Sequence, residues 1–233
     1  MTTLRMRPKT SSRFYGIYLK SILYLFVIIG VSTSYAGSYE DFFSAVRNDD
    51  GPAITALLAR GFDGNVPDPK GDHALLLAVR ENAVKAVSAL LAWNKIDVEP
   101  RNKADESPLM LAALGGQLDI ARRLIDLGAD VNKTGWTPLH YAATRGHLDL
   151  MNLLLEKNAY IDAASPNGTT PLMMAAFYGT PSAVKLLLEA GADPLLRNQK
   201  DLTAIDFAQR ASRADSADII AAFVRARQPK GKW

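Results

Sequence analysis

The side chains that could carry chemistry in this sequence are few, and the three histidines are the first candidates. His73, His140 and His147 are not spaced as the His-x-x-x-His or His-Glu-x-x-His pairs that hold a metal ion on one helix face. The sequence has no cysteine, which excludes thiolate metal sites, cysteine nucleophiles and disulfides. We therefore expect no metal site and no cofactor.

Sequence motifs for catalysis are also absent. The chain contains no Gly-x-Ser-x-Gly elbow, no phosphate-binding loop and no dinucleotide-binding glycine pattern. Asp119, Asp130, Asp149 and Asp193 recur at matching positions of a repeated unit, which favours capping and turn formation over paired-carboxylate catalysis. We predict that the protein is not an enzyme and has no small-molecule substrate.

Large aromatic and cationic side chains remain, and they suit binding. Trp136, Phe177 and Tyr178 are of the type that concentrates binding energy at protein interfaces, with packing onto a neighbouring unit as the alternative role. Arg80, Arg145 and Arg210 form a spaced series that would suit an acidic partner, with a solvated face as the alternative.

One unit repeats six times along the chain. Small-residue pairs begin at Ala45, Ala78, Ala112, Ala142, Ala175 and Ala208, with spacings of 33, 34, 30, 33 and 33 residues. Apolar pairs end at Leu58, Leu91, Ile125, Leu155, Leu188 and Val224, with spacings of 33, 34, 30, 33 and 36 residues. Two markers that share one period predict a stack of similar units.

Each unit has the pattern of two short helices. A hydroxyl residue before proline, as at Ser107, Thr137 and Thr170, is typical of a helix N-cap followed by proline at the first helical position. The second helix is expected to end where a residue tolerates the left-handed conformation. These positions are Gly61, Asn94, Gly128, Asn158 and Gly191.

Residues 135–147, Gly-Trp-Thr-Pro-Leu-His-Tyr-Ala-Ala-Thr-Arg-Gly-His, resemble the ankyrin repeat nearly position for position, as do residues 154–159 and 187–193. The resemblance covers residues 38–227. It implies an all-α ankyrin-repeat solenoid of about six helix-turn-helix units with short β-hairpin fingers. The expected units are approximately 38–67, 68–101, 102–132, 133–164, 165–197 and 198–227, within a domain at 37–227.

The resemblance also implies how the units are used. His140 is expected to hydrogen-bond between units, and a protein partner is expected to bind the finger tips and the concave face of the first helices. The candidate partner-binding residues on that surface are Arg80, Glu81, Lys103, Glu106, Trp136, Thr144, Arg145, Thr169, Phe177, Tyr178, Lys200 and Arg210.

Two departures from the regular spacing predict local differences. The 30-residue spacing removes three residues between Gly128 and Thr137, so we expect a stunted or absent finger there. The 36-residue spacing predicts a longer loop between the two helices of the last unit, at residues 210–216. Both end units are expected to be polar caps, followed by a flexible tail at 228–233.

The N-terminal segment has the pattern of an export signal. Five basic residues and no acidic one lie in residues 1–36, with an apolar run at 22–31 and small residues at Ser34 and Ala36. We predict a signal peptide cleaved after Ala36 and a periplasmic or secreted protein. The alternative is an anchor in the inner membrane at residues 14–31, and only in that case would the protein contact a membrane.

This segment also explains the charge. The whole chain has 27 basic and 24 acidic residues, but without the five basic residues of the segment 22 basic face 24 acidic residues, a net charge of about −2. Nucleic acid is therefore not expected as a partner. Asn132 and Asn167 match the N-glycosylation pattern, which we interpret as incidental in an exported bacterial protein.

The resemblance to the ankyrin repeat predicts the function less specifically than it predicts the fold. The predicted role is a non-catalytic module that binds a protein outside the cytoplasm. The alternatives are an inhibitor or immunity protein for a toxin or enzyme, an accessory factor for an envelope stress enzyme, and a secreted effector. The partner and the oligomeric state are not specified by the sequence.

Overall fold

A computed structural model describes residues 37–227 of the chain. The predicted signal peptide or anchor at 1–36 and the predicted tail at 228–233 lie outside the described residues. Residues 37–47 are helical. Eleven further helices follow within the described range: α2 (Gly51–Ala59), α3 (Ala74–Arg80), α4 (Val84–Ala92), α5 (Pro108–Gly115), α6 (Leu118–Asp126), α7 (Pro138–Arg145), α8 (Leu148–Glu156), α9 (Pro171–Phe177), α10 (Pro181–Glu189), α11 (Ala204–Arg210) and α12 (Ala214–Arg227).

The chain divides into two compact units, Met1–Ser44 and Ala45–Trp233. In the described part of the first, the Tyr39 ring lies 5.0 Å from that of Phe43, which in turn contacts Phe42 edge-on at 5.5 Å. Glu40 and Asp41 are exposed beside these rings, as expected for a polar end unit.

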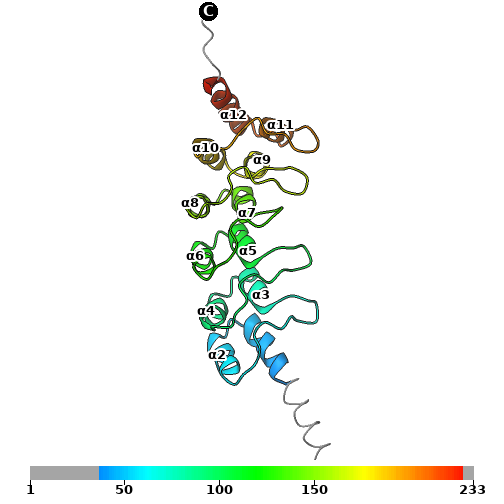
Figure 1. Cartoon of the computed structure of the whole chain (residues 1–233), viewed down its shortest axis with the longest axis vertical. Coiled ribbons are helices and arrows are strands. Elements are labelled where there is room, and N and C mark those ends of the chain that lie inside the picture. The colour runs from blue at the N-terminus through cyan, green and yellow to red at the C-terminus, as the bar shows by residue number, and fades with distance from the viewer. Residues whose placement is uncertain (1–36, 228–233) are drawn as a thin grey trace, which may run out of the picture. The chain divides into compact units, whose positions relative to one another are not determined.

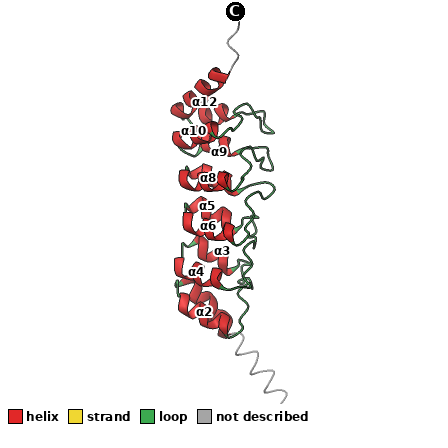
Figure 2. Cartoon of the chain, turned by 60° about the vertical axis from the view of Figure 1, so that its left-hand side comes forward, coloured by secondary structure: helices red, strands yellow, loops and turns green. Residues whose placement is uncertain are grey.

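The helices of the second unit form two rows. Helices α3, α5, α7, α9 and α11 pack side by side in one row, and the second helix of each pair lies in the other (Figure 1). The connecting loops project to one side of the first row, and Figure 2 draws residues 37–227 as helices joined by loops. This is the predicted all-α stack of helix pairs.

Small residues let the first-row helices approach closely. The first alanine of each small pair from Ala78 onward has no exposed surface, which leaves no room for a larger side chain between neighbouring helices. Gly179 marks the closest approach, because a Cβ atom there would clash with the Ala143 carbonyl oxygen of α7. The apolar residues of the second row, such as Leu124 and Leu187, complete the core.

Side-chain oxygens form two of the three predicted N-caps, those at Ser107 and Thr170, whereas Thr137 makes no such bond. Ser107 Oγ accepts a hydrogen bond from the Met110 N–H at 3.2 Å, and Thr170 Oγ1 accepts one from the Met173 N–H at 3.4 Å. Each bond satisfies a backbone donor that the first turn of a helix otherwise leaves without a partner.

The regular fingers are the loops at residues 68–72, 102–106, 165–169 and 198–202, each of which precedes a first-row helix. Each of them is closed by its first residue. Asp68, Asn102, Ser165 and Asn198 each donate their backbone N–H to the carbonyl four residues later, over 2.8–3.2 Å. Their side-chain oxygens accept N–H bonds from the same turn. The fingers are thus turns anchored by a short polar side chain, and the expected β-strands are not formed in residues 37–227, apart from one antiparallel bridge between Pro67 and His73.

The finger before α7 is different. No backbone bond of this kind closes residues 132–136, although Asn132 lies five residues before Thr137, as Asn102 does before Ser107. The backbone N–H of Asn132 donates to the Asp130 side chain instead, and its own side chain bonds the Asn158 carbonyl and the Tyr160 N–H. The deletion predicted this stunted finger.

Three details of the sequence prediction are wrong. Residues 214–216 belong to α12, so the loop between the helices of the last unit is not lengthened. Ile220, which is 1% exposed and lies 33 residues after Leu187, is the core residue, instead of the Phe223–Val224 pair. Helix α4 also ends differently, because Trp93 is extended and Asn94 does not have a positive φ.

Candidate protein-binding groove

A groove lies between the fingers and the first-row helices at the C-terminal end of the stack. It has a volume of about 280 Å³. We call it the α9–α11 groove, and its lining residues are Trp136, Asn167, Thr169, Met174, Phe177, Tyr178, Asn198, Lys200, Leu202, Phe207 and Arg210. Two successive fingers form one wall, and α9 and α11 form the other.

The aromatic side of the groove is a cluster of three rings. The Phe177 and Tyr178 ring centroids are 4.5 Å apart, and Phe207 meets Phe177 edge-on at 6.0 Å. Met174 lies three residues before Phe177 in α9, and Phe207 lies three residues before Arg210 in α11. In each helix the two lining residues therefore lie on the same face. Tyr178 is 55% exposed, which leaves an apolar surface open to a partner.

The backbone under these rings is fixed from the next unit. The Arg213 guanidinium donates to the carbonyl oxygens of Gly179 at 2.6 Å and Tyr178 at 3.0 Å. A charged donor that satisfies the last carbonyls of a helix stabilises its end. The aromatic surface is therefore held in place before any partner arrives.

The finger wall is also tied together. The Gln199 N–H donates to the Asn167 carbonyl at 3.0 Å, and its side chain donates to the Pro166 carbonyl at 2.8 Å. Gly168, with φ of +77°, passes so close to Asn198 that a Cβ atom would lie 3.2 Å from the Asn198 Cα. Only glycine fits this position without strain.

His140 connects the groove to the core. The backbone N–H of Thr137 donates to Nδ1 at 3.1 Å, so Nδ1 is the acceptor and Nε2 carries the proton that bonds the Thr169 carbonyl at 2.9 Å. Burial lowers the pKa of His140 from 6.5 to about 4. The bond to Thr169 is the link between units that the resemblance implied, and the Trp136 ring packs edge-on against His140 at 5.2 Å.

The structure brings half of the predicted binding residues into this groove: Trp136, Thr169, Phe177, Tyr178, Lys200 and Arg210. Of these, Thr169 is buried and contributes chiefly through its backbone. Arg80 and Arg145 line a second cavity of about 410 Å³ around Leu114 and Gly115, and Arg80 also pairs with Asp72 at 3.2 Å.

The other four predicted residues line neither cavity. Glu81 and Lys103 are exposed, and the Thr144 hydroxyl donates to the His140 carbonyl at 2.7 Å. Glu106 accepts bonds from Asn102 at 2.7 Å and from the Tyr141 hydroxyl at 3.0 Å. Burial and the Glu106 carboxylate raise the pKa of Tyr141 above its usual range. The Tyr141 hydroxyl therefore keeps its proton and donates it in a hydrogen bond between two units.

The sequence reasoning missed Met174, Phe207, Asn167 and Asn198 as lining residues. The helical period could have found the first two, since each lies one turn before a residue that was predicted. The positions of the two asparagines depend on how the fingers fold, and the sequence indicates only that these segments form turns.

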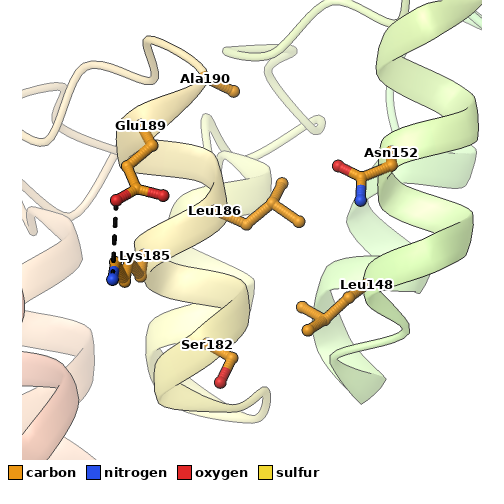
Figure 3. Close-up of a pocket in the computed structure, with 7 residues that line it drawn as sticks. All are labelled: Leu148, Asn152, Ser182, Lys185, Leu186, Glu189 and Ala190. Atoms are coloured by element: carbon orange, nitrogen blue, oxygen red, sulfur yellow. Dashed lines mark ion pairs between the residues drawn. The ribbon is translucent and has the colours of Figure 1, made fainter.

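A third cavity, of about 510 Å³, lies between α8 and α10 in the second row. Leu186 points across it toward Leu148 and Asn152 (Figure 3). Its charged residues, Lys185 and Glu189, pair with each other at 3.8 Å, so this face offers a partner two leucines and little net charge.

The described part of the chain contains no group of three or more His, Cys, Asp or Glu side chains that could hold a metal ion, and none of its helices is long and apolar enough to cross a membrane.

The family model for ankyrin repeats matches residues 42–134 and 130–198. The chain therefore belongs to the ankyrin-repeat family. Domains of this family are generally binding modules for proteins and generally non-catalytic.

Similar sequences occur in much longer proteins. The chain is 36% identical over 126 residues to the ankyrin repeat and KH domain-containing protein mask-1 of Caenorhabditis elegans, and 33% identical over 153 residues to the nuclear factor NF-kappa-B p105 subunit of Mus musculus. These matches cover 52% and 63% of the chain but only 5% and 16% of the relatives. The relatives' activities as whole proteins therefore do not transfer to this chain.

Solved structures match over a larger share of their own length. A chain of the complex between a predatory endopeptidase and an immunity protein of Bdellovibrio bacteriovorus is 30% identical, with a TM-score of 0.69, and the match covers 78% of this chain and 97% of that one. The ankyrin repeat domain of human ASB11 is 28% identical with a TM-score of 0.70, over 82% of this chain and 88% of that one.

Proposed function

We propose that this protein is a non-catalytic module that binds a protein partner through the α9–α11 groove and the adjoining finger tips. The observation that carries the proposal is the fixed aromatic cluster of Phe177, Tyr178 and Phe207, which leaves Tyr178 more than half exposed. Large, rigid aromatic side chains lose little conformational entropy on binding and are enriched in interface hot spots. Family membership supports the same class of function.

The test is capture of binding proteins with three forms of the full chain. The first is the wild type, the second carries Trp136→Ala, Phe177→Ala and Tyr178→Ala, and the third carries Leu148→Ala and Leu186→Ala on the outer row. We expect the wild type and the outer-row variant to retain the same partner and the groove variant to lose it. Retention by a folded groove variant would contradict the proposal.

A second candidate function is inhibition of an enzyme, as an immunity protein does. It is favoured by the likeness to a chain of the endopeptidase–immunity protein complex, which covers nearly all of that chain. Such an inhibitor would bind its enzyme one to one and abolish its activity, and the gene for the enzyme would lie beside its own. A groove partner that is neither an enzyme nor encoded nearby would count against this function.

We also propose export, on the basis of the basic residues, apolar run and small residues within positions 1–36. The mature protein would act in the periplasm or outside the cell, and it would start at Gly37.

A further inference from the structure

We infer that the α9–α11 groove takes an acidic segment of a protein partner, with a large apolar side chain of that segment on the aromatic cluster. This inference rests on the proposed function, because it assumes that the groove is the binding surface, and it adds the chemistry of the partner.

The charge of the groove is the first argument. Its lining includes two cations, Lys200 and Arg210, and no carboxylate. Both side chains are exposed, and neither takes part in the ion pairs found in the described structure. The lining therefore carries two positive charges in a region of the chain, 37–233, that is slightly negative as a whole.

The neighbouring acidic groups are already engaged. Asp201 pairs with Arg197 at 3.1 Å. Asp206 accepts bonds from the backbone N–H and the hydroxyl of Thr203, at 2.8 and 2.7 Å, and these bonds, with the nearby charges of Arg197 and Arg210, lower the pKa of its carboxyl. Neither Lys200 nor Arg210 forms an ion pair within residues 37–227, although the Asp206 carboxylate lies near enough to Arg210 for their charges to attract. Both cations can therefore still approach a partner carboxylate, Lys200 without competition from Asp206.

The apolar lining is the second argument. The same lining includes five apolar or aromatic residues: Met174, Phe177, Tyr178, Leu202 and Phe207. The volume of about 280 Å³ is just below the roughly 300–1,000 Å³ of pockets that enclose a drug-sized ligand. It therefore suits one large side chain of an extended segment better than a free small molecule.

The polar wall supplies the third argument. The Asn198 side chain is used within its own finger, where its oxygen accepts N–H bonds at 2.9 and 3.1 Å. The Asn167 oxygen likewise accepts bonds from Ser165 and Thr169, which leaves its amide NH₂ as an exposed donor at the finger tip. Such a donor suits the carbonyl oxygens of an extended chain.

Single-stranded nucleic acid also combines negative charge with rings that stack. The groove disfavours it, because only two cations line it, whereas binding along a nucleic acid backbone depends on neutralising many phosphates. We therefore assign a protein segment to the groove and treat nucleic acid as an outcome of the test.

The experiment is selection from a random dodecapeptide library displayed on phage, with the full chain as bait. We expect enriched peptides to place Asp or Glu beside Trp, Tyr, Phe or Leu. Lys200→Glu with Arg210→Glu should weaken these peptides at least about tenfold, since two charge contacts are reversed. Lys85→Glu with Arg122→Glu, which makes the same charge change at exposed sites outside the groove, should leave their affinity unchanged.

The possible results separate the two proposals. Peptides that lose binding to the groove variant Trp136→Ala, Phe177→Ala, Tyr178→Ala but contain no acidic residue would overturn this inference and leave the proposed function intact. Peptides that bind that variant as well as the wild type would count against the proposed function itself. An empty selection, or tight binding of single-stranded oligothymidylate that Lys200→Glu with Arg210→Glu removes, would also overturn the inference.

Discussion

At the scale of single residues, His140 is the clearest case of a titratable group with a structural purpose. Its ring is held as a neutral tautomer between the Thr137 N–H and the Thr169 carbonyl, and protonation of Nδ1 would place two N–H groups against each other. The family resemblance predicted the bond between units. The depth of burial, and hence the low pKa, required the structure.

His140 should make stability fall in acid. Burial holds its pKa at about 4 in the folded state, against 6.5 in the unfolded state, so unfolded chains bind more protons between these values. The free energy of unfolding should drop by about 2 kcal/mol between about pH 7 and pH 5 from this group alone. Urea unfolding at both pH values measures it.

The matched control for this prediction is His140→Gln, which keeps a polar side chain but does not titrate. All other groups titrate alike in both proteins, so the variant should show a smaller drop in stability. Equal drops in the two proteins would show that His140 is not the cause.

Gly179 should be irreplaceable by alanine. A Cβ atom there meets the backbone of Ala143 and Ala175, which cannot move aside as a flexible side chain can. We expect Gly179→Ala to lower the free energy of unfolding by about 1–3 kcal/mol. In α5, the atoms nearest to a Cβ atom on Gly115 belong to the Gln117 side chain, at 3.2–3.4 Å, so Gly115→Ala should cost clearly less. Equal effects of the two substitutions on the denaturation midpoint would argue against the close contact between α7 and α9.

At the scale of elements, the helix pairs were predictable because caps and periodicity are local signals. Ser107 and Thr170 cap their helices as the hydroxyl–proline pattern indicates. The fingers were harder to predict, because Asp68 and Asn198 close their fingers, whereas Asn132 at the matching position bonds Asn158 and Tyr160 instead. The resemblance suggested strands there, but turns of this length leave no run of backbone groups to pair.

The register of α12 gives a direct test of the corrected repeat spacing. Ile220 is 1% exposed, whereas Phe223 is half-buried and stacks with Arg227 at 4.3 Å. We expect Ile220→Ala to cost about 2–4 kcal/mol and Phe223→Ala clearly less, although phenylalanine loses more atoms. Chemical denaturation of both variants measures the difference. A larger loss for Phe223→Ala would restore the 36-residue register that the sequence suggested.

At the scale of the whole molecule, half of the predicted binding residues meet in one groove because equivalent positions of successive repeats align in the stack. Phe177 and Arg210 occupy the same position in neighbouring units, so the period itself brings them together. The sequence did not show in which units the side chains at these positions are left without partners inside the protein. Glu106 was predicted to face a partner, but its carboxylate already accepts hydrogen bonds from Asn102 and Tyr141.

Export is a prediction at this scale. Cleavage after Ala36 should leave a mature protein that begins at Gly37, which mass spectrometry of the protein from a periplasmic or culture fraction measures. A protein that keeps residues 1–36 and sediments with membranes would support the anchor instead.

The central claim, that the α9–α11 groove binds the partner, is tested most directly by the dissociation constant of the purified partner. Isothermal titration with the Trp136→Ala, Phe177→Ala, Tyr178→Ala variant should show a loss of about a hundredfold or more, since interface aromatics often contribute about 2 kcal/mol each. The outer-row variant Leu148→Ala, Leu186→Ala should bind as the wild type does. Equal affinities of the two variants, both with the helical content of the wild type, would contradict the account.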